Sequence, residues 1–368
     1  DNDSLSGLAR AICLAHKEYI KLRPESSQGQ GLSAARILFV VQPGERNVLD
    51  QRLLEYQIAA ESANEPSGRF HCLRATLKQV ASFGSAATES CAKGPAEVLR
   101  FKGHEVSVAY FRAGYTPDDY PTEVEWQGRA LIEHSFAIKC PCVAYHLAGT
   151  KKVQQQLARE GELERFVKPP DALALRAVFA GLYGLDLKQR TDEAEPEQLD
   201  ESATAAVAEA KARPHDFVLK PQREGGGNNL FGAELKEALE TWSPALLATH
   251  ILMEKINPPT VQSTLIRNGS VMSGESVVEL GLFGVFLGNS SRQLLSEPGG
   301  HLLRAKLSGV DEGGVAAGYA VLSSPLLVED RLLVDSLATQ GKGADGAAQG
   351  NAGEEPDPPR LKRQCTEF

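Results

Sequence analysis

The chain has 368 residues, of which 42% are hydrophobic and 24% charged, a composition typical of soluble globular proteins. Its 39 basic and 48 acidic residues give a formal net charge of -9, and no long basic stripe is present, which argues against a general nucleic-acid binder. The apolar runs have the length of buried strands and fall short of about eighteen residues, so we expect no membrane span.

The first segment combines a helix with a linker. Apolar residues recur at helical spacing over residues 4–22, and a polar, glycine-containing stretch then breaks the pattern. The chain starts Asp-Asn-Asp-Ser, without a methionine or a signal pattern, so we expect a fragment or a processed product. Residues 1–34 are therefore predicted to form a helix and a linker.

Strands and helices alternate over the next hundred residues. The run ARILFVVQP, residues 35–43, is nearly continuous in apolar residues, which is typical of a strand covered on both faces. The segments that follow are a helix over 48–63, a helix near 71–83, a loop of glycine, alanine and serine, a buried strand over 105–115 and a helix over 125–139. This alternation predicts a parallel α/β domain over residues 35–145.

The pattern changes after residue 145. Helical segments are predicted over 151–166, 171–184 and 201–213, and strands over 217–222, 249–256, 277–287 and 301–307. Because these strands alternate polar and apolar residues and are joined by turns, we expect a largely antiparallel sheet with helices against it, an α+β domain over 146–333. Residues 334–368 are rich in Gly, Ala and Pro and are predicted to form a disordered tail.

A glycine-rich loop follows the strand FVLKPQ. Lys220 ends the apolar part of this strand, and Glu224 precedes the glycines 225–227. Consecutive glycines let backbone N–H groups approach phosphate oxygens, and a carboxylate is a typical Mg²⁺ ligand. The loop matches no named phosphate-binding fingerprint. Phosphate binding and a tight surface turn that needs glycines both remain open from the residues alone.

Two weaker candidates lie elsewhere. The segment DEGGVAAGYAVL, residues 311–322, has the small residues of a loop that closes over a ligand, and it equally fits a packed turn. The strand with Arg304 and Lys306 fits a solvated basic face as well as a site. The six cysteines are dispersed, which favours a reducing compartment, and Cys140 and Cys142 are interpreted as half-buried thiols rather than as metal ligands.

Several of these motifs together carry a resemblance. GERNVLDQR, YFRAGY, HLAGTKKVQQQLA, FVLKPQREGGGNN, ILMEKI, VVELGLFGVF, HLLRAK and EGGVAAG stand in the order and approximate spacing of eukaryotic glutathione synthetase, an ATP-grasp ligase. The match spans about residue 5 to about residue 325 and looks more like the plant and green-algal branch. The family's N-terminal region is not in this sequence, so the resemblance implies either part of a full enzyme or a truncated chain.

The resemblance implies the biochemistry. ATP would phosphorylate the cysteinyl carboxylate of γ-glutamylcysteine, and glycine, or β-alanine or serine in some plants, would displace phosphate to form glutathione. It also implies Mg²⁺, a homodimer, and a cytoplasmic or plastid location. Residues 35–145 would form the substrate-binding domain and residues 146–333 the ATP-grasp domain. The alternative is a catalytically incomplete nucleotide-binding remnant with an interaction role.

The resemblance also implies site residues. The expected ATP contacts are Lys151, Lys220, Gln222, Glu224, Gly225, Gly226, Gly227, Asn228, Asn229, Phe231, Met253, Glu254, Lys255, Ile256, Glu279, Lys306 and Glu312, with Glu224 also a magnesium ligand. The expected substrate contacts are Glu45, Arg46, Asn47, Gln51, Arg112, Ala113, Gly114, Tyr115, Arg304, Val315 and Ala316. Arg304 and Lys306 are the expected catalytic residues. Animal enzymes have tyrosine where Phe231 stands and aspartate where Glu312 stands.

Overall fold

The computed structural model describes residues 2–23, 35–66, 68–91, 94–190, 192, 195–222, 228–289, 291–309, 315, 318 and 320–325. The helices and strands named below belong to one compact unit, Asp1–Ser323. Among the described residues, no helix is both long enough and apolar enough to cross a membrane. The domain boundaries given above remain predictions, and the tail over 334–368 lies outside the described residues.

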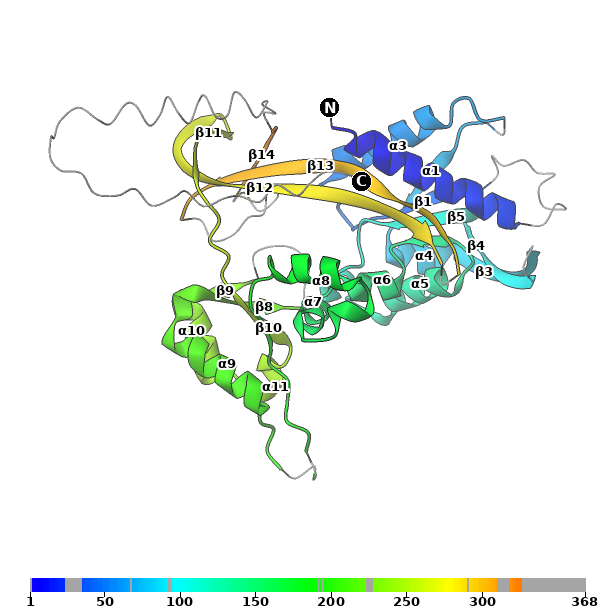
Figure 1. Cartoon of the computed structure of the whole chain (residues 1–368). Helices are drawn as coiled ribbons and strands as arrows, with labels where there is room; N and C mark the ends of the chain where they lie inside the picture. The colour runs from blue at the N-terminus through cyan, green and yellow to red at the C-terminus, as the bar shows by residue number, and fades with distance from the viewer. Residues whose placement is uncertain are drawn as a thin grey trace, which may run out of the picture. The chain divides into compact units, whose positions relative to one another are not determined.

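The first sheet has six strands in the order β2, β1, β5, β4, β3, with β6 also paired to β5. Figure 1 labels β1, β3, β4 and β5 of this sheet. Pairing is parallel between β2, β1, β5 and β6 and antiparallel between β5, β4 and β3. The strands are β1 (Arg36–Val40), β2 (His71–Ala75), β3 (Gly84–Cys91), β4 (Gly94–Phe101), β5 (His104–Phe111) and β6 (Ile138–Cys140).

Helices bury both faces of this sheet. The helices are α1 (Ser4–Leu22) and α3 (Val48–Glu61) on one face, and α4 (Leu77–Phe83) and α5 (Glu123–His134) on the other. In β1, Ile37 and Phe39 pack with the first pair, and Leu38 and Val40 with the second. Because successive strand residues point to opposite faces, burial on both sides accounts for the unbroken apolar run.

Helices α4 and α5 begin at threonine caps and touch closely. Thr76 and Thr122 each form a capping box with the residue three positions later. A Cβ on Gly128 would lie 2.2 Å from the carbonyl oxygen of Leu77, so glycine is what allows this approach. The contact sets Arg129, the next residue of α5, against the turn that follows β5.

The second sheet is antiparallel, with the order β7, β10, β8, β9. Its strands are β7 (Leu182–Gly184), β8 (Phe217–Pro221), β9 (Leu230–Phe231) and β10 (His250–Glu254), and α9 (Glu201–Ala212) and α10 (Gly232–Thr241) accompany it. Phe217, Leu219 and Leu252 form a buried core with Ala206 of α9 and Leu235 of α10. Burying such side chains is the main stabilising contribution here.

The third sheet is also antiparallel, with the order β11, β12, β13, β14. Its strands are β11 (Val261–Arg267), β12 (Ser270–Gly288), β13 (Gln293–Leu307) and β14 (Val321–Ser323). Helix α1 packs against β12 and β13. The remaining elements are α6 (Val143–Ala148), α7 (Lys151–Ala158), α8 (Pro169–Arg176), α11 (Pro244–Leu247), η2 (Pro117–Asp119), η3 (Leu163–Arg165) and η4 (Pro214–Asp216).

The predicted fold class, a parallel α/β part followed by a largely antiparallel part, is confirmed. Some local predictions are wrong. The predicted helix near 71–83 begins as β2, the predicted glycine, alanine and serine loop forms β3 and contributes to a hairpin with β4, and β6 and β7 end two predicted helical segments. Residues 84–91 have weak strand propensity, and their pairing with β4 overrides it.

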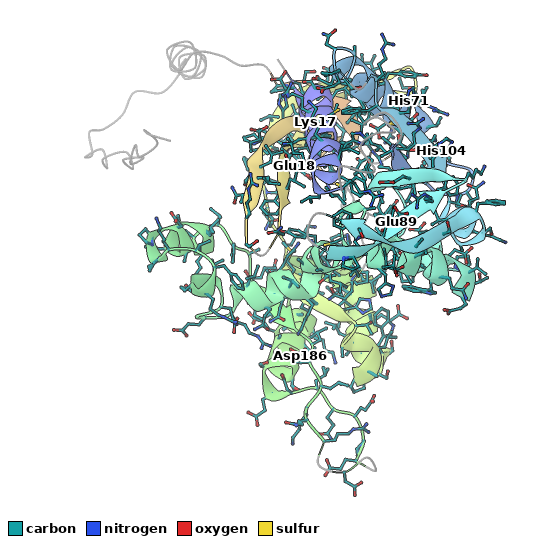
Figure 2. All side chains as sticks on the ribbon, turned by 90° about the vertical axis from the view of Figure 1, so that its right-hand side faces the viewer. Lys17, Glu18, His71, Glu89, His104 and Asp186 are labelled. Carbon is teal, nitrogen blue, oxygen red and sulfur yellow. The ribbon has the colours of Figure 1, made fainter. Side chains whose placement is uncertain are left out.

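A buried charge cluster joins the end of α1 to β3 and β5. Arg23 is 4% exposed, and its guanidinium lies 2.8 Å from carboxylate oxygens of both Glu89 and Glu105; Figure 2 labels Glu89 on β3. Removing one partner of a buried ion pair leaves a desolvated charge. We expect Arg23→Met to lower the free energy of unfolding by about 3 kcal/mol, measured by urea denaturation.

Arg213 provides the matched control, because its ion pairs with Glu209 and Asp216 are exposed. We expect Arg213→Met to cost less than about 1 kcal/mol. An equal decrease in the free energy of unfolding in the two variants would contradict a structural role for the buried cluster.

Candidate functional site

The residues expected to contact substrate lie at the carboxyl ends of β1 and β5. These strands are parallel neighbours, with Val40 opposite Phe111, and the Arg112 N–H donates to the Val40 carbonyl at 2.8 Å. The structure thereby brings the loop over 41–47 beside the turn over 112–116. Ligands in α/β sheets bind at such strand ends.

The carboxylate of Glu45 organises the first loop. Its two oxygens accept hydrogen bonds at 2.8 Å from the Asn47 N–H and from the Gln51 side-chain amide. Burial opposes ionisation, but these bonds and the Arg112 charge outweigh it and lower the pKa of Glu45. Gln51 is itself buried and accepts a hydrogen bond from Arg74 at 2.5 Å. The Glu45 carboxylate is therefore ionised and committed to shaping its own loop.

Arg46 and Arg112 differ in their surroundings. Arg46 is exposed, and within the described part of the chain it has no ion-pair partner. The Arg112 guanidinium lies 2.6 Å from the Asp50 carboxylate, and although burial alone would lower it, the pKa of Arg112 is raised by Tyr110 and Asp50. Arg112 thus presents a fixed cation at the strand end, suited to a carboxylate.

The turn over 112–116 is tightly held. Ala113 and Gly114 are buried, and Gly114 has φ +87°, a left-handed conformation that favours glycine. Tyr115 is 42% exposed and its hydroxyl accepts a hydrogen bond from Gln42 at 3.3 Å. A cavity of about 440 Å³ borders the same strand ends, with Val41, Ala113 and Asp119 among its lining residues.

The residues expected to contact ATP begin at the end of β8. Lys220 lies opposite Ile251 of β10. The Gln222 side-chain oxygen accepts a hydrogen bond at 3.0 Å from the N–H of Lys152, in the first turn of α7. The start of the glycine-rich loop is therefore tied to the helix that begins with Lys151. Glu224 and Gly225, Gly226 and Gly227 lie outside the described residues; Asn228 and Asn229 follow them.

Strand β10 has the segment expected to contact the nucleotide base. The Glu254 carboxylate accepts hydrogen bonds from the Tyr183 hydroxyl at 2.8 Å and from the Gly181 N–H at 3.2 Å. The hydrogen bond between Tyr183 and Glu254 raises the pKa of Tyr183 to about 12. The N–H groups of Glu254 and Lys255 donate to the carbonyls of Gly181 and Asp216. Among the described residues the Ile256 N–H has no acceptor, so it is the first donor of this segment open to a ligand.

Other expected nucleotide residues surround this segment. Met253 pairs with Val218 and Leu182 on the two sides of β10. The Lys255 ammonium lies 5.7 Å from the ring centroid of Phe231. The aromatic ring at this position thus packs beside a cation without needing a hydroxyl group.

Glu279, Arg304 and Lys306 share one face of the third sheet. Arg304 lies opposite Glu279, and the two form an ion pair, while Lys306 lies two residues farther along β13. Directly opposed residues point to the same face, so the three side chains form one polar strip. Val315 lies outside the strands, and Glu312 and Ala316 are outside the described residues.

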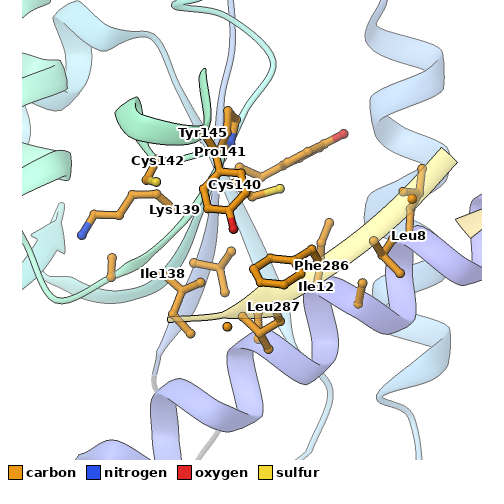
Figure 3. A pocket seen from close by; sticks show the side chains of 18 residues that line it. Leu8, Ile12, Ile138, Lys139, Cys140, Pro141, Cys142, Tyr145, Phe286 and Leu287 are labelled. Carbon is orange, nitrogen blue, oxygen red and sulfur yellow. The ribbon is translucent and has the colours of Figure 1, made fainter. Parts of the chain in front are cut away.

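The Cys-Pro-Cys segment borders a separate pocket. Cys140, Cys142 and Tyr145 line a cavity of about 420 Å³ together with Phe286 and Leu287 of β12 (Figure 3). Both cysteines are free. In the parts of the chain that are described, no group of three or more His, Cys, Asp or Glu side chains could hold a metal ion. Cys142 is half-buried as predicted, whereas Cys140 is exposed. That both act as plain thiols rather than as metal ligands stays a prediction, and the sequence patterns gave no sign of the apolar pocket.

The effect of the hydrogen bonds on the pKa of Glu45 can be measured by titration. A carboxyl group whose pKa is lowered in the folded state stabilises the fold at pH values above its ordinary pKa. This contribution is lost as the pH falls through the lowered pKa. We expect Gln51→Ala to raise the pKa of Glu45 toward its ordinary value, measured by carboxyl carbon NMR titration. Arg112→Met, which removes a smaller contribution, should raise it less. An unchanged titration midpoint in Gln51→Ala would contradict the hydrogen-bond account.

Comparisons with known proteins place the chain in a family. A sequence profile of the eukaryotic glutathione synthase ATP-binding domain matches residues 1–327. Glutathione synthetase of Xenopus laevis is 40% identical over 331 residues, which cover 89% of this chain and 62% of that protein. The chloroplastic glutathione synthetase of Arabidopsis thaliana is 40% identical over 331 residues, covering 89% of this chain and 54% of that protein. Glutathione synthetase of Homo sapiens is 40% identical over 328 residues, covering 88% and 61%. The chain thus spans less than two thirds of each of these relatives.

A solved structure agrees in fold. A glutathione synthetase-like effector from Globodera pallida, in its apo form, superimposes with a TM-score of 0.61 at 22% identity, covering 89% of this chain and 62% of that one. The profile match includes every helix and strand from α1 to β14. The chain belongs to the family of the eukaryotic glutathione synthase ATP-binding domain.

Proposed function

We propose that this protein is a glutathione synthase that joins γ-glutamylcysteine to glycine at the expense of ATP. The observation that carries the proposal is the hydrogen bond from Lys152 to Gln222, which ties the start of α7, with Lys151, to the end of β8, with Lys220. Two cations beside a glycine-rich loop suit a triphosphate. Membership of the family supports the same activity.

The reaction has two steps that need no protein nucleophile. An oxygen of the cysteinyl carboxylate attacks the γ-phosphorus of ATP, and ADP leaves. The amine of glycine then attacks the carbon of the acyl phosphate, the carbon–oxygen bond to phosphate breaks, and the amine nitrogen loses a proton. Catalysis accordingly rests on positioning and on neutralising phosphoryl charge.

Basic side chains would perform that neutralisation. Lys151, Lys220 and Lys306 are assigned to the phosphates, and the backbone at Ile256 to the base. Arg112 and Arg304 are assigned to substrate carboxylates, where a planar guanidinium can form two hydrogen bonds. Arg112 pairs with Asp50 and Arg304 with Glu279, so substrate carboxylates would compete with or join these ion pairs.

Magnesium belongs to the proposal through Glu224. When bound, the ion would neutralise triphosphate charge, and carboxylate oxygen is a ligand type that it prefers. Asn228 and Asn229 directly follow the glycines and could orient the same loop.

Three further assignments belong to the proposal. The amine substrate is glycine, with β-alanine or serine as alternatives, and the enzyme is a homodimer with a cytoplasmic or plastid location. Chloroplastic relatives from Arabidopsis thaliana and Solanum lycopersicum support the plastid location.

Lys220 should contribute strongly to nucleotide affinity. A hydrogen bond to a charged group is worth about 1.5–3 kcal/mol, so we expect Lys220→Ala to weaken ATP binding by about 10- to 100-fold in calorimetry. Lys236 is an exposed lysine of α10 and provides the control, since Lys236→Ala should leave the affinity within about twofold. An equal effect of both substitutions on ATP affinity would contradict a role for Lys220 in nucleotide binding.

Substrate dependence tests the activity itself. Phosphate release from ATP should require both γ-glutamylcysteine and glycine and should yield one glutathione per phosphate. We expect the loss of activity in Lys220→Ala to parallel the loss of ATP affinity. Tight ATP binding with no substrate-dependent phosphate release would contradict the proposal and favour a nucleotide-binding remnant.

A further inference from the structure

The carboxylate of Asp119 lies inside the turn over 112–116. Its Oδ2 accepts hydrogen bonds from three successive backbone N–H groups, those of Gly114 at 2.9 Å, Tyr115 at 3.2 Å and Thr116 at 3.4 Å. Its Oδ1 accepts from the side-chain amide of Gln42 at 3.3 Å. A single side chain at the end of η2 therefore fixes the whole turn.

The opposite side of the Gly114 residue is held as well. Its carbonyl oxygen accepts from the Tyr120 hydroxyl at 2.8 Å and from the Arg129 guanidinium at 3.2 Å. Arg129 is 6% exposed, pairs with Glu133 at 2.8 Å and lies 4.1 Å from the ring centroid of Phe111. Gly114 cannot rotate its peptide groups without breaking bonds on both sides.

Gln42 connects this turn to the neighbouring loop. It follows β1 and donates to both the Tyr115 hydroxyl and Asp119. The Tyr115 ring is thereby held beside the loop over 41–47, where Glu45 and Asn47 lie. Asp119 is thus the point at which the two loops at the strand ends meet.

Successive N–H groups that converge on one point form an anion-binding concavity. In this turn the protein's own carboxylate occupies it, so these N–H groups are not available to a substrate carboxylate. We propose that Asp119 is a positioning residue that fills this concavity and presets the side chains of Arg112 and Tyr115 for the γ-glutamyl substrate. Arg112 then becomes the anion-binding group of the turn, and Ala113 and Gly114 contribute shape only. This inference rests on the proposed function.

Substitution of Asp119 should alter affinity for one substrate only. In Asp119→Asn the charge is lost and one acceptor oxygen remains, so we expect the KM for γ-glutamylcysteine to rise about tenfold while the KM for ATP stays within about twofold. In Asp119→Ala the N–H groups are exposed, and added formate should restore part of the lost affinity. Glu123→Gln, at an exposed position at the start of α5, is the control for loss of one negative charge and should change neither KM.

Amide hydrogen exchange separates the two proposals. We expect Asp119→Asn to accelerate exchange at Gly114, Tyr115 and Thr116 while β1 and β5 stay protected, whether or not the protein turns over. Unchanged exchange at these three amides would overturn the positioning role. Accelerated exchange with an unchanged KM for γ-glutamylcysteine would overturn the link to substrate. If exchange is accelerated but the protein binds no γ-glutamylcysteine, Asp119 still holds the turn over 112–116, and the proposed function is refuted.

Discussion

The parallel pairing of β1 with β5 is the constraint on which the substrate side of the site depends. It sets two strand ends side by side, and each of them continues directly into a loop with charged or amide side chains. The pairing itself is stabilised from both faces, because alternate residues of β1 are buried against different helix pairs. Polar groups can therefore be concentrated at the strand ends of a sheet whose interior is mostly apolar.

Charged groups of the candidate site pair with one another or accept hydrogen bonds within the protein. Arg112 pairs with Asp50 and Arg304 with Glu279, while Glu45 and Asp119 accept several hydrogen bonds each. Such pairing holds the side chains in a limited set of conformations, which lowers the entropy lost when a ligand binds. It also separates the tasks of the charged residues: Glu45, Asp119 and Glu254 accept hydrogen bonds from backbone N–H groups, whereas Arg112 and Arg304 are the groups suited to anions.

The sequence predicted much of the fold because its signals are local. Helix α1 was predicted over its observed range, and β1, β5, β8 and β10 over nearly theirs, because apolar periodicity and flanking glycine or proline mark them. Strands β2, β3, β6 and β7 were among those missed, and β3 and β6 show the reason most clearly. Their residues lack a strand pattern of their own, and pairing with β4 and β5 creates them.

The candidate site could be predicted only in part. Lys220, Arg112 and Arg304 stand in motifs that carry the resemblance to the family, and their roles in binding remain predictions. The role of Asp119 was not predicted. Its bond from the Thr116 N–H follows the T-x-x-D capping-box pattern, but the bonds from the Gly114 and Tyr115 N–H groups depend on the path of the five-residue turn. Gln222 was predicted as an ATP contact, whereas the structure adds a bond from its side chain to α7.

The formation of an acyl phosphate is the central claim and can be tested by isotope transfer. γ-Glutamylcysteine with ¹⁸O in its cysteinyl carboxylate would be incubated with the protein, ATP and glycine, and the released phosphate analysed by mass spectrometry. We expect one ¹⁸O atom in each released phosphate, because the carboxylate oxygen that attacks phosphorus stays bonded to phosphorus when the carbon–oxygen bond of the acyl phosphate breaks. Phosphate without ¹⁸O, released in step with ATP consumption, would contradict it.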